Sequence, residues 1–138
     1  MSQTVKVTVN RQGDRLNAST GSPWEPKVGY SRAVRIGSHI AVTGTVGVEA
    51  DGTFGPTLAQ QSRRALTIIN AALEALGASR QDVVRTRIYV TDISKWEEVG
   101  AVHGEFFADI RPATTMVEVA KLIDDAAFVE IEADAIVS

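Results

Sequence analysis

The chain ends in two segments that together decide its fold. Residues 111–122 read RPATTMVEVAKL, and after a short connection residues 129–133 read VEIEA. Valine, isoleucine and threonine favour strands, and in the second segment apolar residues alternate with glutamate, as in a strand that buries one face. We therefore expect two strands at the end of the chain, over about 113–120 and 127–137.

The first third of the chain predicts further strands and a loop. Val5–Val9 alternates apolar and polar residues, which indicates a strand with one buried face. Residues 11–31 are rich in glycine, serine, asparagine and proline, so they are expected to form an ordered loop. Two apolar runs, Arg32–Gly37 and His39–Gly44, flank Gly37-Ser38, a dipeptide that suits a two-residue hairpin turn.

Two capping signals mark the starts of two helices. Thr57 and Gln60 have the spacing of a capping box, an apolar stripe follows them, and Gly77 is a natural helix stop. Ser94 and Glu97 repeat that spacing. The apolar stripe of the second helix would consist of Trp96, Val99, His103, Phe106 and Ile110.

Between these helices, Val83–Thr91 is expected to be a strand with two unlike faces. One face would carry Val84, Thr86, Ile88 and Val90, and the other Arg85, Arg87 and Tyr89. The second face would also include the acidic Glu130, Glu132 and Asp134 and the apolar Met116 and Phe128. A face that is half apolar and charge-paired suggests self-association with closed symmetry.

The order of these elements is strand, two strands, helix, strand, helix, two strands. One mixed sheet with two helices packed on one face satisfies this order. The predicted class is α+β, with residues 1–138 forming a single domain, because a chain of 138 residues suits one hydrophobic core.

The composition excludes several kinds of function. Without cysteine there is no disulfide, thiolate nucleophile or cysteine-based metal site, and a net charge of −3 argues against a nucleic-acid surface. No apolar run is long enough to span a membrane, and the N-terminus lacks the apolar core of a secretory signal, so a soluble cytoplasmic protein is expected. No metal is expected, since His39 and His103 stand far apart in the sequence and no cysteine accompanies them. No cofactor is expected either, and Gly44–Gly47 lacks the strand-to-helix context and the lysine of a phosphate-binding loop.

Five segments, in order along the chain, show which family the chain resembles. They are Gly29–Ala33, Ala41–Gly47, Val90–Ile93 followed by Trp96, Phe106-Phe107 and Glu130–Ala133. With the C-terminal PATTM they resemble the signature of the Rid (reactive-intermediate deaminase, YjgF-type) family over nearly the whole chain from about residue 28. The resemblance implies a homotrimer of chorismate-mutase-like subunits, with a central barrel and a ligand cleft between each pair of neighbours.

The resemblance also implies roles for individual residues. In the deaminating members these clefts hydrolyse an enamine or imine to a 2-oxo acid and ammonia. By position, Glu130 would hold the attacking water, Tyr30 would close the pocket, and Gly44 would lie at the end of its strand. In those members an arginine that binds the substrate carboxylate follows Pro-Ala, but here this position is Thr114, with Met116 beside it on the pocket floor.

Replacing that arginine changes what the cleft can bind. An arginine grips a carboxylate with two charge-assisted hydrogen bonds, whereas a threonine offers one neutral donor, a difference of roughly 2–4 kcal/mol. Arg32 and Arg111 are the candidates to compensate; the alternatives are an ion pair for Arg32 and a surface position for Arg111. Glu130 has an alternative too, a structural pairing with Arg85 or Arg87, and His103 is expected to be a core or interface residue.

Three functions fit these observations. The first is a hydrolase or deaminase that acts on an imine, enamine or related C–N metabolite and has weak activity on 2-aminoacrylate-type substrates. The second is a non-catalytic trimer that binds a small metabolite or a protein. The third, an RNase or translation inhibitor, is the weakest because the chain is acidic.

Overall fold

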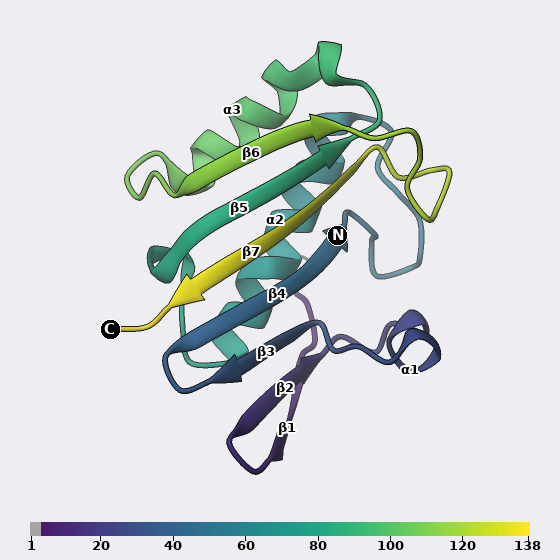
Figure 1. Cartoon of the computed structure of the whole chain (residues 1–138). Helices are drawn as coiled ribbons and strands as arrows, with labels where there is room; N and C mark the ends of the chain where they lie inside the picture. The colour runs from purple at the N-terminus through teal and green to yellow at the C-terminus, as the bar shows by residue number, and fades with distance from the viewer. Residues whose placement is uncertain (1–3) are drawn as a thin grey trace.

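A single mixed sheet organises the part of the chain that the computed structural model describes, residues 4–138 (Figure 1). Its strands are β1 (Thr8–Gln12), β2 (Arg15–Ser19), β3 (Ala33–Ile36), β4 (His39–Val46), β5 (Val83–Val90), β6 (Ala113–Glu118) and β7 (Val129–Ile136). They lie in the order β1-β2-β3-β4-β7-β5-β6. Neighbouring strands are antiparallel except β5 and β6, which run parallel, so the prediction of a mixed sheet is confirmed.

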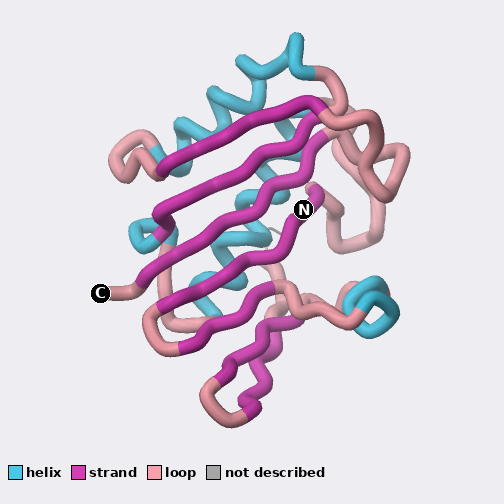
Figure 2. The backbone as a smooth tube through the Cα atoms, in the orientation of Figure 1, coloured by secondary structure: helices cyan, strands magenta, loops and turns pink. Residues whose placement is uncertain are grey.

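The two long helices cover one face of this sheet and leave the other face open. They are α2 (Leu58–Ala75) and α3 (Trp96–Phe107), and both lie behind the sheet in Figures 1 and 2. The core between them and the sheet includes Leu66, Ile69 and Leu73 of α2, all almost fully buried. This arrangement confirms the predicted α+β class. No helix within residues 4–138 has the length and apolar character needed to cross a membrane.

The strong local signals of the sequence are confirmed. Thr57 Oγ1 accepts a hydrogen bond from the amide of Gln60 at 3.1 Å, and Gln60 Oε1 accepts one from the amide of Thr57 at 3.3 Å. Gly77 follows α2 with a φ of +80°, a conformation that glycine adopts without strain. The hairpin of β3 and β4 turns at Gly37-Ser38, where the φ of Gly37 is +60°.

The N-terminal prediction is wrong in two respects. The first strand lies at Thr8–Gln12 rather than 5–9, and the expected loop 11–31 contains β2 and a short helix, α1 (Trp24–Val28). Every residue of β1 is exposed, so the strand buries no face and its sequence has no alternation of apolar and polar residues that would predict it. The strand exists because it pairs with β2, which in turn pairs with β3 and buries Ala18.

The expected capping box at the second helix is also wrong. Asp92 Oδ1 accepts hydrogen bonds from the amide and the hydroxyl of Ser94, at 3.1 and 2.6 Å, and so caps a 3-10 turn, Ile93–Lys95. The α3 helix then begins at Trp96 without a side-chain cap. Its buried residues are Val99, Val102 and Phe107, whereas Trp96 of the predicted stripe is exposed.

Two residues lie on the opposite side from the one predicted. Val84 is exposed because a bulge interrupts β5: Val83 pairs with Ala135, and the next pair is Arg85 with Asp134. Met116 was expected on the open face, but it is aligned with Ile88 in the parallel pair of β5 and β6 and packs against the core under the helices. The last two strands are otherwise close to their predicted bounds, although both are slightly shorter.

Candidate functional site

Glu130 lies in β7 on the open face of the sheet, against a bulge in β4. The register of β4 against β7 shifts between Val42 and Thr45, and Gly44 lies in the shifted segment. A β-carbon on Gly44 would overlap the carboxylate of Glu130, so that carboxylate would have to move to admit any side chain. The glycine therefore allows the close approach of Glu130 to the backbone of β4.

Arg32 ties this bulge to Tyr30. Its Nη1 donates to the carbonyl oxygen of Gly44 at 3.1 Å and to Thr45 Oγ1 at 3.2 Å. Its Nη2 donates to the hydroxyl of Tyr30 at 3.2 Å. Because Arg32 is only 7% exposed, these bonds hold its guanidinium in one place beside the bulge. We refer to Tyr30, Arg32, Gly44 and Glu130 as the Glu130 cluster.

A buried glutamate balances the charge of Arg32. Glu25 Oε2 lies 4.0 Å from Arg32 Nε, and both side chains are buried. Glu25 also accepts hydrogen bonds from the amide and hydroxyl of Thr20, at 3.3 and 3.2 Å. Arg32 was predicted either to point into the cleft or to form an ion pair. It forms an ion pair with Glu25 and also lies near Glu130, the predicted catalytic residue.

The surroundings of Glu130 favour its protonated form. Its half-buried position raises the pKa of the Glu130 carboxyl above its usual 4.5, and the negative charge of Glu132 raises it further, while the positive charge of Arg32 opposes both. A carboxyl with these neighbours is able to exchange a proton nearer to neutral pH than an exposed glutamate.

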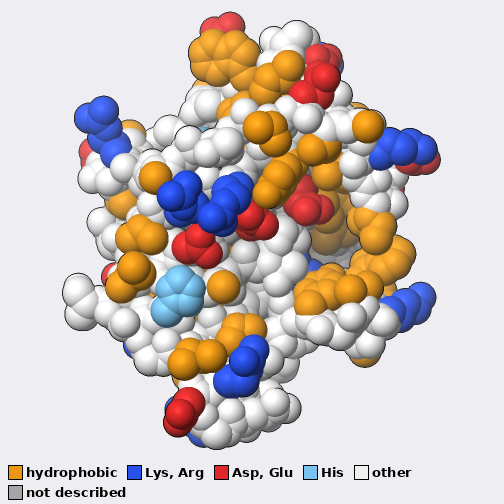
Figure 3. Space-filling model, viewed as in Figure 1, with side chains coloured by type: hydrophobic (Ala, Val, Ile, Leu, Met, Phe, Trp, Pro, Cys, Tyr) orange, Lys and Arg blue, Asp and Glu red, His pale blue; other side chains and the backbone are white. Residues whose placement is uncertain are grey.

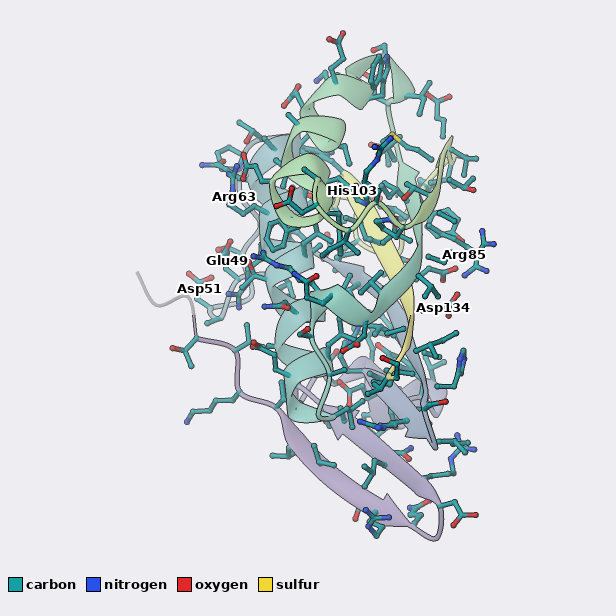
Figure 4. The ribbon with its side chains drawn as sticks, turned by 90° about the vertical axis from the view of Figure 1, so that its left-hand side faces the viewer. Glu49, Asp51, Arg63, Arg85, His103 and Asp134 are labelled. Carbon is teal, nitrogen blue, oxygen red and sulfur yellow. The ribbon has the colours of Figure 1, made fainter. Side chains whose placement is uncertain are left out.

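Thr114 belongs to a different group, on the helix face of the sheet. In the parallel pair of β5 and β6 it is aligned with Thr86, and their hydroxyl oxygens lie 2.8 Å apart. Thr86 Oγ1 also lies 2.9 Å from His103 Nε2 of α3, and Thr114 Oγ1 donates to the carbonyl oxygen of Pro112 at 3.2 Å. His103 is labelled in Figure 4. The sequence did not reveal this series of hydrogen bonds, because only the pairing of β5 with β6 places Thr86 between Thr114 and His103.

Thr114, His103 and Arg111 line one groove between α3 and the start of β6. The groove has a volume of about 290 Å³, and its other lining residues are Gly100, Gly104, Phe107, Ala108 and Pro112. Arg111 has a φ of +58°, an unusual conformation for a residue with a side chain. Met116 was predicted to form part of the pocket floor, but it does not line this groove. We refer to His103, Arg111 and Thr114 as the Thr114 groove.

A single chain does not bring the two groups together. Glu130 points to the open face, since it is aligned with Tyr89, whereas Thr114 points to the helix face with buried Thr86. The strand β5 also lies between β7 and β6. The predicted site residues therefore form two half-sites on opposite faces of the sheet.

Comparison with known proteins shows how much of this chain is shared. The profile of a family described as Endoribonuclease L-PSP matches residues 20–137, which include both half-sites. The chain belongs to this family. The family also goes under the names YjgF, RutC and Rid, so the predicted membership is confirmed.

Relatives of this L-PSP family member include proteins with a named activity. The chain is 32% identical over 111 residues to a 2-iminobutanoate/2-iminopropanoate deaminase of Salmonella typhimurium, which covers 78% of this chain and 86% of the relative. It is also 32% identical over 117 residues to an uncharacterized protein of Streptomyces coelicolor, with 84% of this chain and 87% of the relative covered.

Solved structures from the L-PSP family share the fold. Rv2704 from Mycobacterium tuberculosis, a member of the YjgF/YER057c/UK114 family, is 55% identical and has a TM-score of 0.84, covering 89% of this chain and 99% of that one. The YjgF gene product of Escherichia coli is 33% identical with a TM-score of 0.73, covering 78% and 87% respectively. The β1 and β2 strands both precede the region that the family profile matches.

The open face of this L-PSP family member carries a charged cluster among apolar side chains (Figure 3). Arg87 Nη1 lies 3.2 Å from Glu132 Oε1 and 3.1 Å from Asp134 Oδ2, and the hydroxyl of Tyr89 donates to Glu132 at 3.2 Å. Arg85 and Asp134 extend away from the helices in Figure 4. The predicted pairing of Arg87 with acidic residues is thus confirmed, and its partners are Glu132 and Asp134 rather than Glu130.

Proposed function

We propose that the protein is a hydrolase of C–N bonds that deaminates an imine, an enamine or a related metabolite. The observation that carries the proposal is the half-buried Glu130 against the glycine bulge, with Arg32 and Tyr30 in fixed positions beside it. Relatives that are named imine deaminases, about one third identical, support the same reaction class.

The reaction needs a proton acceptor and an oriented water molecule, and Glu130 would supply the first. The oxygen of water adds to the imine carbon while the Glu130 carboxylate takes a proton from it. Passing this proton to the nitrogen gives a carbinolamine, which carries a hydroxyl and an amino group on the same carbon. Glu130 would then take the hydroxyl proton and deliver it to the nitrogen, so that the C–N bond breaks, the carbonyl group forms and ammonia leaves. A carboxyl whose pKa is raised suits both halves of this exchange.

Tyr30 would contact the substrate. Its hydroxyl oxygen accepts a hydrogen bond from Arg32 Nη2, so the hydroxyl proton remains available to a ligand. Tyr30 also lies at the edge of a wide groove of about 860 Å³ on the open face, over β1 to β4. A tyrosine in this position would both orient a ligand and cover it.

Thr114 would restrict the substrates. Its hydroxyl proton is donated to the Pro112 carbonyl, and its oxygen is already within hydrogen-bond distance of Thr86. The Thr114 hydroxyl therefore has no proton left to donate to a substrate carboxylate. We expect 2-aminoacrylate-type substrates to be deaminated poorly.

The two half-sites suggest an active site shared between subunits. The edge strand β6 carries the Thr114 groove, and its outer backbone groups are unpaired within residues 4–138. A second copy placed against the open face would bring one half-site of each subunit together. This supports the proposed homotrimer with a central barrel of chorismate-mutase-like subunits. A monomeric mass in light scattering at micromolar concentration would refute it.

A turnover assay tests the proposal. Purified oligomer is mixed with 2-iminobutanoate generated in situ and with a panel of bulkier imines, and ammonia release is measured. We expect turnover of at least one imine and a loss of about 100-fold or more in Glu130→Gln. The exposed Glu105→Gln is the matched control and should keep full activity.

The alternative is a trimer that binds a small metabolite or acts as a regulator without catalysis. Binding of a ligand that depends on Tyr30, with no ammonia release from any imine, would support it. The endoribonuclease activity in the family's name is less compatible with a net charge of −3. Cleavage of RNA by the wild-type protein but not by Glu130→Gln would favour that activity. The expected cytoplasmic location stays a prediction.

A further inference from the structure

Glu25 of the short helix α1 fixes the backbone that leads to Tyr30. Its carbonyl oxygen accepts hydrogen bonds from the amides of Gly29 and Tyr30, at 2.9 and 3.0 Å. The φ of Gly29 is +89°, so the chain turns out of α1 in a conformation that glycine adopts without strain. The backbone of Glu25 therefore determines where Tyr30 leaves the helix.

The side chain of Arg32 holds the other end of Tyr30. Besides the hydrogen bond from Nη2 to the Tyr30 hydroxyl, the guanidinium carbon lies 5.4 Å from the centre of the Tyr30 ring, as in a cation–π contact. The backbone of Arg32 is fixed as well, since its amide donates to the Ala18 carbonyl of β2 at 2.8 Å and its carbonyl accepts from the Thr43 amide of β4 at 2.9 Å. Arg32 thus contacts both the ring and the hydroxyl of Tyr30 from a rigid position in the sheet.

An ion pair joins Glu25 to Arg32. Arg32 Nε is buried and has no hydrogen-bond partner within residues 4–138, and Glu25 Oε2 lies 4.0 Å from it, beyond hydrogen-bond distance. The other nitrogens of the guanidinium donate to the bulge at Gly44 and to Tyr30. The charge of Glu25 therefore stabilises the buried cation, while the hydrogen bonds of that cation go to the Glu130 cluster.

Arg32 is the one cation among the groups of residues 4–138 that act on Glu130. Burial and the charge of Glu132 raise the pKa of the Glu130 carboxyl, and Arg32 lowers it. Tyr89, aligned with Glu130 in β5, is neutral at pH 7, because burial raises the pKa of its hydroxyl. On the other side, the β4 residue aligned with Glu130 is the uncharged Val46. The position of the Arg32 guanidinium is thus the feature that can move this carboxyl toward its charged form.

Glu25 is not among the groups that act directly on Glu130, so an effect of Glu25 on that carboxyl has to pass through Arg32. We propose that Glu25 is a positioning residue of the Glu130 cluster and acts on Glu130 and Tyr30 through Arg32. Glu25 holds the guanidinium, and the guanidinium holds the Tyr30 hydroxyl and the backbone of the bulge. This inference deepens the proposed function, on which it rests, because it names a residue outside the reacting atoms that orients them.

The sign of a pKa shift tests the inference. Removing a negative charge ordinarily lowers the pKa of a nearby carboxyl, because a repulsion is lost. If Glu25 acts by holding Arg32, Glu25→Gln instead loosens the cation beside Glu130 and raises the pKa of Glu130. Carboxyl ¹³C signals of the labelled protein, followed against pH, measure this pKa, and Glu130→Gln identifies the signal. Glu105→Gln, which removes an exposed carboxylate, is the control and should leave the pKa of Glu130 as in wild type.

Two variants of Arg32 separate its charge from its hydrogen bonds. Glu25→Gln/Arg32→Gln leaves no lone buried charge, so it avoids the instability of either single change, and it should raise the pKa of Glu130 at least as far as Glu25→Gln does. Arg32→Lys keeps a cation near Glu130 but lacks the planar fork that reaches both the bulge and Tyr30. It should therefore leave the pKa of Glu130 close to that of wild type and still lower the turnover of imines by about ten-fold or more.

Turnover adds a second readout for Glu25. With an imine that wild type deaminates, Glu25→Gln should lower kcat by about ten-fold and move the acidic limb of the pH–rate profile upward, together with the pKa of Glu130.

The outcomes distinguish this inference from the proposed function. A pKa of Glu130 that falls or stays unchanged in Glu25→Gln would overturn the positioning role, and turnover of imines by wild type would then leave the hydrolase intact. Wild-type turnover in Arg32→Lys would overturn the part assigned to the hydrogen bonds. A raised pKa in Glu25→Gln without turnover of any imine by wild type would refute the hydrolase and leave the positioning role of Glu25.

Discussion

The Glu130 cluster and the Thr114 groove differ in how much of their structure depends on one chain. In the cluster, Arg32 is buried, bonded to both the bulge and Tyr30, and paired with buried Glu25. In the groove, Arg111 is exposed and has no ion-pair partner within residues 4–138, and Thr114 lies on an edge strand.

This difference indicates in which of the two groups a residue can be substituted without loss of the fold. Each residue of the cluster supports another, so a substitution there affects the packing of β4 as well as the chemistry. In the groove, Thr114 bonds only to Thr86 and to the Pro112 carbonyl, and the Arg111 side chain forms no ion pair within residues 4–138. A substitution that leaves the fold intact is therefore expected more readily at position 114 in the groove than in the cluster.

The largest expected effect is on stability, at Arg32. Arg32→Met would leave the Glu25 carboxylate buried without its cation and the Gly44 carbonyl without its donor. We expect a loss of about 3–5 kcal/mol in the free energy of unfolding. Urea unfolding at a fixed protein concentration measures it. Arg63→Met, which removes an exposed ion pair with Glu105, is the control and should cost no more than about 1 kcal/mol. Equal losses in the two variants would mean that the cluster is no more integrated than the surface.

The next effect is a gain of binding in the groove. Thr114→Arg should bind pyruvate about 2 kcal/mol more tightly than wild type, or about 30-fold, because a guanidinium forms two charge-assisted bonds with a carboxylate. Calorimetry on the intact oligomer is the measurement. Thr115→Arg, on the opposite face of the same strand, should give no gain. An unchanged affinity in Thr114→Arg would show that the groove differs from an arginine-bearing site by more than one residue.

A smaller effect is expected at the bulge. Gly44→Ala would force the Glu130 carboxylate to move, and because this carboxylate ends a flexible side chain, the cost in stability should be only about 1 kcal/mol. Turnover should fall much more than stability. The double variant Gly44→Ala/Glu130→Ala should recover the lost stability but not the activity, as measured by urea unfolding and ammonia release. No recovery would mean that the two groups do not collide.

The smallest effect is the dependence of stability on pH at Glu130. Burial, together with the Glu132 charge, raises the pKa of Glu130 above its usual 4.5, so the native state binds this proton more tightly than the unfolded state. Its stabilising contribution is complete below about pH 4.5 and is lost as the pH rises through the native pKa. The stability of wild type relative to Glu130→Gln should therefore fall over that range of pH, as measured by urea unfolding at a series of pH values. If the stability of wild type relative to Glu130→Gln rose with pH instead, the pKa of Glu130 would be lowered in the native state and not raised.

Local patterns predicted those parts of the fold whose signals lie within a few residues. The capping box of Thr57 and Gln60 and the turn at Gly37 are examples, because each is satisfied by neighbours in the chain. Pairing with distant strands determines the exposed β1 strand and the bulge at Val84. At Ser94, the capping pattern with Glu97 is lost because the nearer Asp92 carboxylate takes the hydrogen bonds of Ser94. Periodicity does not contain that information.

For the candidate site, the sequence predicted the residues but not how they are arranged in space. The family resemblance named Tyr30, Gly44 and Glu130, and the structure brings them together around Arg32. It also named Thr114, but not its distance from Glu130 within one chain, because alignment does not show which face of a sheet a residue occupies. His103 was predicted as a core or interface residue; its contact with Thr86 needs the three-dimensional structure.

The β1–β2 hairpin bears on how molecules of this protein associate with one another. A sheet can grow into a fibre only if both of its edges accept a further strand. The β6 edge is open, but the opposite edge is β1, a strand of five exposed residues, one of which is Arg11. A charged, solvated edge of this kind disfavours an added strand. The hairpin, all of which precedes the family-matched region, is therefore expected to disfavour aggregation and to favour assemblies that close over assemblies that extend.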